Sequence, residues 1–260
     1  EIYMITHPFL SMQNVAHGFF SSKGGVSKKP FFSLNCSFNN QDKRKNVIKN
    51  LEIVKKKLQL KNLLKINQIH SSKVKIIQDL KSFNADYEGD GIVTSLRKVG
   101  IAILTADCCP ILFVDKKNEI IAACHAGWRG AVSGIVEETV KSMVNIGANN
   151  RSIVAVIGPT IHKKSYEIEN DVCKIIRKTD VFKKEIITEL NNGKYLFDLP
   201  LFIREKLLLS DVRKIGNVNI DTYSNISYFS HRRKFHEISN INENNKKILT
   251  GRQISIIGLV

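Results

Sequence analysis

The chain has 260 residues, of which 43% are hydrophobic and 25% are charged, and this composition excludes a mainly disordered protein. It carries 40 Lys and Arg against 24 Asp and Glu, a formal net charge of +16. The cations are spread along the whole chain, and no basic block is interleaved with aromatic residues as a stacking platform requires, so we expect no nucleic-acid partner.

Cysteine usage and hydropathy indicate the compartment. The five cysteines show no disulfide-framework spacing, we expect no secretory leader, and no run approaches the roughly 18 apolar residues of a membrane span. We therefore expect a cytoplasmic protein in a reducing compartment, without a membrane partner. No repeat, linker or composition break divides the chain, which predicts a single domain over 1–260, as a monomer or a homodimer.

The first ninety residues predict one helix among loops and strands. Residues 17–35 contain the turn signal Gly24-Gly25 and indicate a loop at a sheet edge. Residues 42–58 place their apolar side chains on one stripe, which predicts an amphipathic helix with a solvated basic face. Residues 66–78 predict a strand, a short break at His70 and a second strand. Asp90 opens a turn into a strand over 91–94, and a turn-forming role for this residue is favoured.

The stretch 99–130 predicts a β-hairpin. Residues 101–105 and 111–114 are apolar and rich in β-formers, 116–119 are polar, and 120–124 are apolar again. A turn centred between Lys116 and Lys117 places Cys108 directly opposite His125. Directly opposed residues share a face of the sheet, so a thiol and an imidazole would meet there. Cys109 lies on the alternate face and is expected in the core.

The second half predicts helices between short strands. Apolar residues from Val132 to Val144 keep a helical period, so one helix is expected to start near Trp128, with Arg129 in its first turn and its amino terminus favouring an anion. Further helices are predicted over 170–178 and 198–209, the latter capped by Asp198. Strands are predicted over 152–157, 219–230 and 253–260, and a long surface loop over 234–250.

Three residues form the candidate chemical centre. His70, Cys108 and His125 lie far apart in sequence, but each is predicted at a strand end. Two imidazoles and one thiolate are a usual three-ligand set for zinc that leaves a fourth position open. The spacing is not a compact metal-binding motif, and a thiol beside an imidazole equally suits a metal-free hydrolase with Cys108 as nucleophile and His125 as base.

Acidic and cationic candidates surround this centre. Asp107 and Asp90 are candidates for proton transfer, with no spacing evidence to rank them. An anionic substrate such as phosphate would be bound by guanidinium groups, which hold it through two hydrogen bonds. The candidate substrate- and phosphate-binding residues are Arg129, Arg232, Arg233 and Arg252.

Several strings together resemble a known family. They are HGFFSSKGGVS, NQIHSSKV, DGIVTS, TADCCPILFVD, AACHAGWRG, IGPTIHKKSYEI, DTYSN, and SHRR with TGRQ. They are similar to the YfiH/YlmD family, formerly called DUF152 or polyphenol oxidoreductase laccase. The resemblance covers nearly the whole chain from His17 onward, and TADC with HAGWRG is highly specific.

The resemblance implies a fold, a metal and an activity. The fold would be an α+β sandwich of mixed sheets flanked by helices, similar to the catalytic domain of cytotoxic necrotizing factor. The metal would be zinc on His70, Cys108 and His125, the residues that together with Asp107 form our candidate catalytic set. The activity would be phosphorolysis of adenosine, inosine, guanosine and methylthioadenosine, with deamination of adenosine. Purine nucleosides and phosphate would then be the partners.

Copper-dependent phenol oxidation, the older family label, is the alternative cofactor chemistry. A multicopper site needs more imidazoles than this chain offers, because it has only seven His and several are isolated. The count favours zinc.

Overall fold

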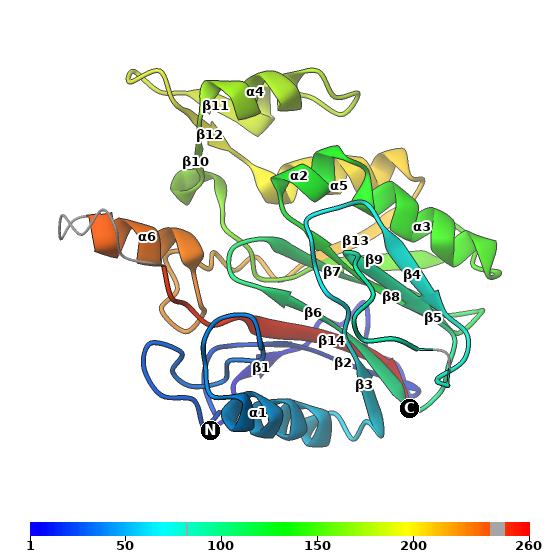
Figure 1. Cartoon of the computed structure of the whole chain (residues 1–260). Coiled ribbons are helices and arrows are strands. Elements are labelled where there is room, and N and C mark those ends of the chain that lie inside the picture. The colour runs from blue at the N-terminus through cyan, green and yellow to red at the C-terminus, as the bar shows by residue number, and fades with distance from the viewer. Residues whose placement is uncertain (82, 240–247) are drawn as a thin grey trace.

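The computed structural model describes residues 1–81, 83–239 and 248–260. Two β-sheets pack face to face, and helices cover the outer face of each (Figure 1). One sheet has the strand order β1 (Met4–Ile5), β2 (Val15–Phe20), β14 (Gln253–Leu259), β6 (Val99–Thr105) and β3 (Asn62–Leu64). The other has the order β13 (Lys214–Asn217), β9 (Ile153–Ile157), β7 (Cys109–Asp115), β8 (Ile120–Ala126), β5 (Gly91–Thr94) and β4 (Val74–Ile77).

Helices occupy both outer layers. Helix α1 (Arg44–Lys57) lies on the five-stranded sheet, whereas α2 (Trp128–Val132), α3 (Ile135–Asn145) and α5 (Leu199–Leu209) lie on the six-stranded sheet (Figure 1). A small third sheet has the order β10 (Glu167–Ile168), β12 (Tyr195–Phe197) and β11 (Ile187–Glu189), and carries α4 (Asn170–Arg177). The remaining helices are α6 (His231–Ser239) and the 3₁₀ turns η1 (Lys163–Ser165) and η2 (Lys184–Ile186).

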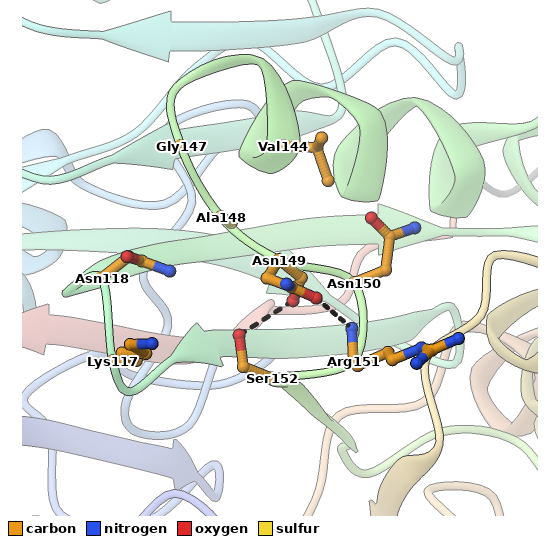
Figure 2. Close-up of a pocket in the computed structure, with 9 residues that line it drawn as sticks. All are labelled: Lys117, Asn118, Val144, Gly147, Ala148, Asn149, Asn150, Arg151 and Ser152. Carbon is orange, nitrogen blue, oxygen red and sulfur yellow. Dashed lines mark hydrogen bonds between the residues drawn. The ribbon is translucent and has the colours of Figure 1, made fainter.

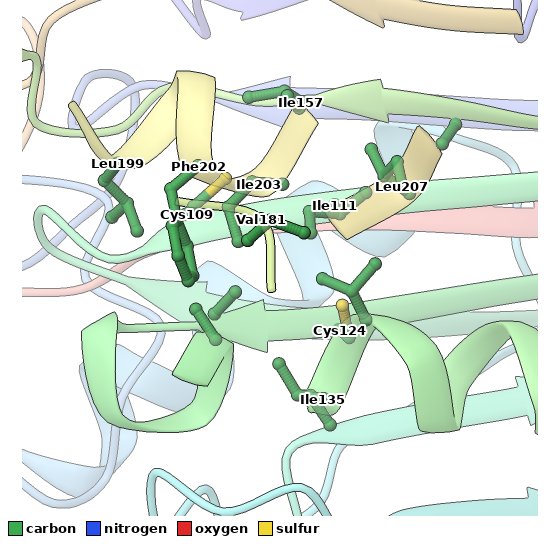
Figure 3. Close-up of a cluster of buried hydrophobic side chains, with 14 of the residues drawn as sticks. Cys109, Ile111, Cys124, Ile135, Ile157, Val181, Leu199, Phe202, Ile203 and Leu207 are labelled. Carbon is green, nitrogen blue, oxygen red and sulfur yellow. The ribbon is translucent and has the colours of Figure 1, made fainter. Parts of the chain in front are cut away.

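Side-chain alternation along β7 divides the core. Ile111 and Phe113 join Cys109 in the cluster under the helices (Figure 3), whereas Leu112 and Val114 face the five-stranded sheet. All five are fully buried, and each large apolar side chain stabilises the fold by about 1.5–3 kcal/mol. Cys109 is therefore a core residue on the helix-covered face, as the alternation predicts.

The hairpin exists, but its predicted register is wrong by two residues, because the structure sets Pro110 and not Cys108 opposite His125. Asp115 pairs with Ile120 and Pro110 pairs with His125, so the turn is centred between Lys117 and Asn118. The Asp115 carboxylate accepts hydrogen bonds from the Lys117 and Asn118 amides, which moves the turn one residue along. A register shift of two residues preserves which face each side chain occupies, so Cys108, just before β7, still lies on the side of the sheet that His125 occupies.

Other expected elements differ from the structure. Residues 66–69 form no strand, because the Gln68 side-chain amide bonds the backbone of Leu104 in place of a ladder. The helix expected from Trp128 to Val144 is broken into α2 and α3 at Gly134, whose φ is +94°. Within 219–230 the backbone makes turns instead of a strand, and α6 replaces the first part of the loop expected over 234–250. Positions 240–247 of that loop lie outside the described residues.

The helices α1, α4 and α5 and the strands β9 and β14 confirm the corresponding predictions. Asp198 caps α5 by accepting a hydrogen bond from the Leu201 amide. Across the three described ranges, no helix is both long enough and apolar enough to cross a membrane.

Candidate metal centre

The structure brings His70, Cys108 and His125 together. One ligand atom from each lies within 4.8 Å of the other two, and the two imidazole rings are perpendicular with centroids 4.7 Å apart. Cys108 Sγ is 4.0 Å from His70 Nε2. His125 is buried at the end of β8, Cys108 is half-buried before β7, and His70 is exposed. Three converging N and S donors with one open side match a zinc site that can admit substrate.

Asp90 organises this centre, contrary to the turn-forming role expected for it. The carboxylate is fully buried and accepts hydrogen bonds from the amides of Ile69, His70 and Ser71 and from the Ser71 hydroxyl. These bonds hold His70 in a left-handed backbone conformation with φ +62°. Asp90 Oδ1 also lies 2.8 Å from His125 Nδ1. That contact directs the His125 Nε2 lone pair toward the other two ligands, as a carboxylate behind a metal-binding histidine does.

Ionisation follows from these contacts. Burial opposes the charge on Asp90, but hydrogen bonds from His125 and Ser71 hold its pKa at about 2. Burial also opposes the Cys108 thiolate, yet the two histidines lower the pKa of this thiol to about 6. Burial opposes the protonated form of His125, but Cys108 and Asp90 stabilise that form and raise the pKa of His125 to about 9. The thiol is therefore ready to act as a thiolate, the form that binds metal or attacks an electrophile.

A side chain at Gly127 would crowd the centre. A Cβ at Gly127 would lie 3.0 Å from Cys108 Sγ and 3.2 Å from His70 Cδ2. The φ of this residue is −71°, so the constraint is space and not backbone conformation. Gly127 precedes α2, in which the Arg129 guanidinium lies 4.5 Å over the Trp128 ring.

Asp107 is a structural hub next to Cys108. Its carboxylate accepts one hydrogen bond of 2.7 Å from the Thr222 hydroxyl and one of 2.7 Å from the Arg232 amide at the start of α6. Its carbonyl oxygen accepts from the Ile161 amide and the Thr160 hydroxyl. One carboxylate oxygen thus holds the start of α6 and the other holds the Thr222 loop, an arrangement that suits positioning better than proton transfer.

The guanidinium groups of the four candidate arginines differ in their hydrogen-bond partners. Arg233 donates to the carbonyls of Thr222, Tyr223 and Tyr228, so its guanidinium is committed to the backbone. Arg252 donates through Nη1 to the Thr250 and Gly251 carbonyls. None of these guanidiniums, nor those of Arg129 and Arg232, forms an ion pair with a carboxylate of the described residues.

Sequence reasoning singled out neither Tyr166 nor the support role of Asp90. Arg232 stacks over the Tyr166 ring with its Cζ 5.4 Å from the centroid and donates to the Glu167 carbonyl. The Tyr166 hydroxyl lies in the electrostatic field of Cys108, Asp107, Arg232 and Arg129.

The supporting role of Asp90 could have been found from the pairing of β5 with β8. This pairing sets Gly91 opposite Cys124 and so places Asp90 beside His125.

A surface pocket of about 720 Å³ lies at the other end of the β7–β8 hairpin (Figure 2). It is lined by Lys117 and Asn118 of the hairpin turn and by residues 147–152 after α3, among them Asn149 and Arg151. None of the metal-site residues lines it. This pocket is therefore separate from the group formed by His70, Cys108 and His125.

Comparison with known proteins identifies the family. The model of the family described as multi-copper polyphenol oxidoreductase laccase matches residues 16–260. The chain belongs to this family. It is 34% identical over 220 residues to a purine nucleoside phosphorylase of Rickettsia conorii, covering 80% of this chain and 90% of the relative. It is 30% identical over 261 residues to the purine nucleoside phosphorylase YlmD of Bacillus subtilis, covering 95% and 89%.

Solved structures of this family share the fold. A Neisseria meningitidis protein of the DUF152 family model superposes with a TM-score of 0.85 at 28% identity, covering 99% of this chain and 98% of that one. Bacillus licheniformis YfiH gives 0.84 at 28% identity, covering 95% and 93%. The resemblance to the YfiH/YlmD family and the α+β fold of mixed sheets with flanking helices are both confirmed.

Proposed function

We propose that this protein is a zinc-dependent purine nucleoside phosphorylase. Its substrates would be adenosine, inosine, guanosine and methylthioadenosine, and it would also deaminate adenosine to inosine. The convergence of His70, Cys108 and His125 carries the proposal, because it supplies an open three-donor centre at a site flanked by unpaired guanidiniums. Relatives at 30–34% identity that bear the name purine nucleoside phosphorylase support it.

The donor set fits zinc. A thiolate and two imidazoles are preferred zinc ligands, and the carboxylate behind His125 supplies the outer support that such sites use. When bound, zinc would polarise a substrate heteroatom or acidify a water molecule. Copper is the alternative ion. In the described part of the chain, however, the one group of possible metal ligands consists of these three residues, which are too few for a multicopper cluster.

Phosphorolysis requires a bound phosphate aimed at C1′ of the ribose. The bond between C1′ and the purine nitrogen breaks, a phosphate oxygen forms the new bond to C1′, and the purine leaves with the electron pair and takes up a proton. Arg129, Arg232 and Arg252 would hold the phosphate, since they lack carboxylate partners and each donates to backbone carbonyls through at most one guanidinium nitrogen, whereas Arg233 uses two. Arg233 would support the fold of this region instead, because backbone carbonyls occupy its guanidinium.

The test is direct. Purified protein is incubated with adenosine or inosine, with and without phosphate, and free bases are separated from nucleosides by chromatography. We expect adenine or hypoxanthine only with phosphate, inosine from adenosine without it, and neither from Cys108→Ala. Absence of all these products above the Cys108→Ala control would refute the proposal.

The thiolate and imidazole pair supports one other candidate, a metal-free hydrolase with Cys108 as nucleophile and His125 as base. Elemental analysis separates the two. Stoichiometric zinc that is lost in His70→Ala excludes the hydrolase, whereas metal-free protein whose Cys108 is rapidly alkylated favours it.

A further inference from the structure

Tyr166 is held rigidly beside the metal centre. It lies between η1 and β10, where its amide donates to the Lys163 carbonyl and its carbonyl accepts from the Phe197 amide at 2.9 Å. The ring packs against the Phe197 ring with centroids 5.6 Å apart. Both the backbone and the ring of Tyr166 are therefore fixed by the small sheet.

Helix α6 fixes the same residue from the other side. The Arg232 guanidinium covers the Tyr166 ring and donates to the neighbouring Glu167 carbonyl at 2.8 Å. The Arg232 amide is itself held by Asp107, the residue before Cys108. A continuous set of contacts thus sets the position of Tyr166 relative to the metal-binding thiol.

The Tyr166 hydroxyl is left without a partner. It makes no hydrogen bond within the described residues, although it lies in the electrostatic field of Cys108, Asp107 and the guanidiniums of Arg129 and Arg232. Burial raises the pKa of this phenol, so it stays protonated and able to donate at neutral pH. Each oxygen of the nearby Asp107 carboxylate accepts one hydrogen bond, from the Thr222 hydroxyl and from the Arg232 amide of α6.

We propose that the Tyr166 hydroxyl, together with the guanidiniums of Arg129 and Arg232, binds the phosphate co-substrate. Arg232 covers the Tyr166 ring, Arg129 acts on the same residue electrostatically, and neither forms an ion pair within the described residues. A neutral donor near two such cations complements a small multivalent oxyanion. A purine or a ribose needs several acceptors as well as donors, and the Tyr166 oxygen is the one acceptor in this group of three. The proposal rests on the proposed function for the role of phosphate, but binding of the anion is measurable without turnover.

Tyr166→Phe removes only the hydroxyl, and Tyr195→Phe is the matched control. Tyr195 lies in the same small sheet and is likewise covered by an arginine, with Arg177 Cζ 5.2 Å from its ring centroid. The first measurement is the rise in melting temperature of the zinc-loaded protein with inorganic phosphate alone. We expect the midpoint phosphate concentration to rise at least about tenfold in Tyr166→Phe, the loss of one hydrogen bond to a charged group, and to stay at the wild-type value in Tyr195→Phe.

Kinetics supply the second measurement. In Tyr166→Phe the KM for phosphate should rise about tenfold more than the KM for inosine. A wild-type phosphate midpoint in this variant, no response of the wild-type protein to phosphate, or a rise confined to the KM for inosine would each overturn the proposal. A shifted phosphate midpoint in a protein that shows no phosphorolysis would support the anion site while refuting the proposed function.

Discussion

Replacing Asp90 by Asn should damage the metal centre and the fold together. The carboxylate accepts five hydrogen bonds, from the Ile69, His70 and Ser71 amides, the Ser71 hydroxyl and the His125 ring. An amide NH₂ at either oxygen position faces at least one backbone N–H. Each buried donor left without an acceptor costs about 1–3 kcal/mol of unfolding free energy.

The effect on metal binding follows from the ring of His125. An Asn NH₂ facing Nδ1 would donate to it, which moves the ring proton to Nε2, the atom that faces the other two ligands. An Asn oxygen facing Nδ1 keeps the tautomer but makes a weaker hydrogen bond to His125 than the carboxylate does. In that orientation the NH₂ group faces the Ile69 and Ser71 amides and leaves them without an acceptor. Changes to such outer partners cost about 10–100-fold in metal affinity. We expect that loss in the zinc Kd of Asp90→Asn.

Asp115→Asn is the matched control. Asp115 is also a fully buried carboxylate, accepting from the Asn118 side chain and from the Asn149 amide at the opposite end of the same hairpin. Both variants should lose about 1–3 kcal/mol or more in denaturant unfolding of the metal-free protein. Only Asp90→Asn should lose zinc in competition with a chelator. Equal zinc affinity in the two variants would refute the reasoning.

The same carboxylate predicts a pH dependence. The pKa of Asp90 falls from 3.8 to about 2 in the folded protein, so its stabilisation is complete above pH 4 and is lost as pH falls toward 2. Each pKa unit corresponds to 1.36 kcal/mol, so the metal-free wild type should lose roughly 2 kcal/mol over this interval relative to Asp90→Asn. Unfolding free energies measured from pH 5 to pH 2 check the sign; a constant difference between the two proteins contradicts it.

Further substitutions test the neighbours of the centre. Gly127→Ala should reduce zinc content because its Cβ crowds the ligands. The control Gly193→Ala has φ +76° and open space around it, so it should cost stability alone. Metal analysis and melting curves distinguish the two variants. Cys108→Ser should lose most zinc and all turnover, whereas Cys109→Ser should keep zinc near one equivalent and lose about 1–3 kcal/mol in stability. Asn at position 107 retains an acceptor oxygen and tolerates the φ of +89°. Asp107→Asn should therefore keep far more activity than Asp107→Ala. An equal loss of activity in both variants would indicate that Asp107 transfers a proton.

Local signals in the sequence predicted the elements whose stabilising contacts are local. The apolar stripe of α1 and the Asp198 cap of α5 depend on neighbours within a few residues, and both elements form where the pattern places them. Alternation also put Cys109 in the core and Cys108 on the other face, because the two-residue period of a strand survives a shift of register.

Contacts between distant segments decided the rest. The role of Asp90 depends on the pairing of β5 with β8 and on a partner 35 positions away, so its local pattern showed only a turn. The helix α6 begins where Asp107 accepts the Arg232 amide, 125 positions away, and the polar stretch that contains it carries no comparable local signal. The sequence by itself determined which residue types could hold a metal, whereas only tertiary packing decided which carboxylate supports them and which arginines lack a carboxylate partner.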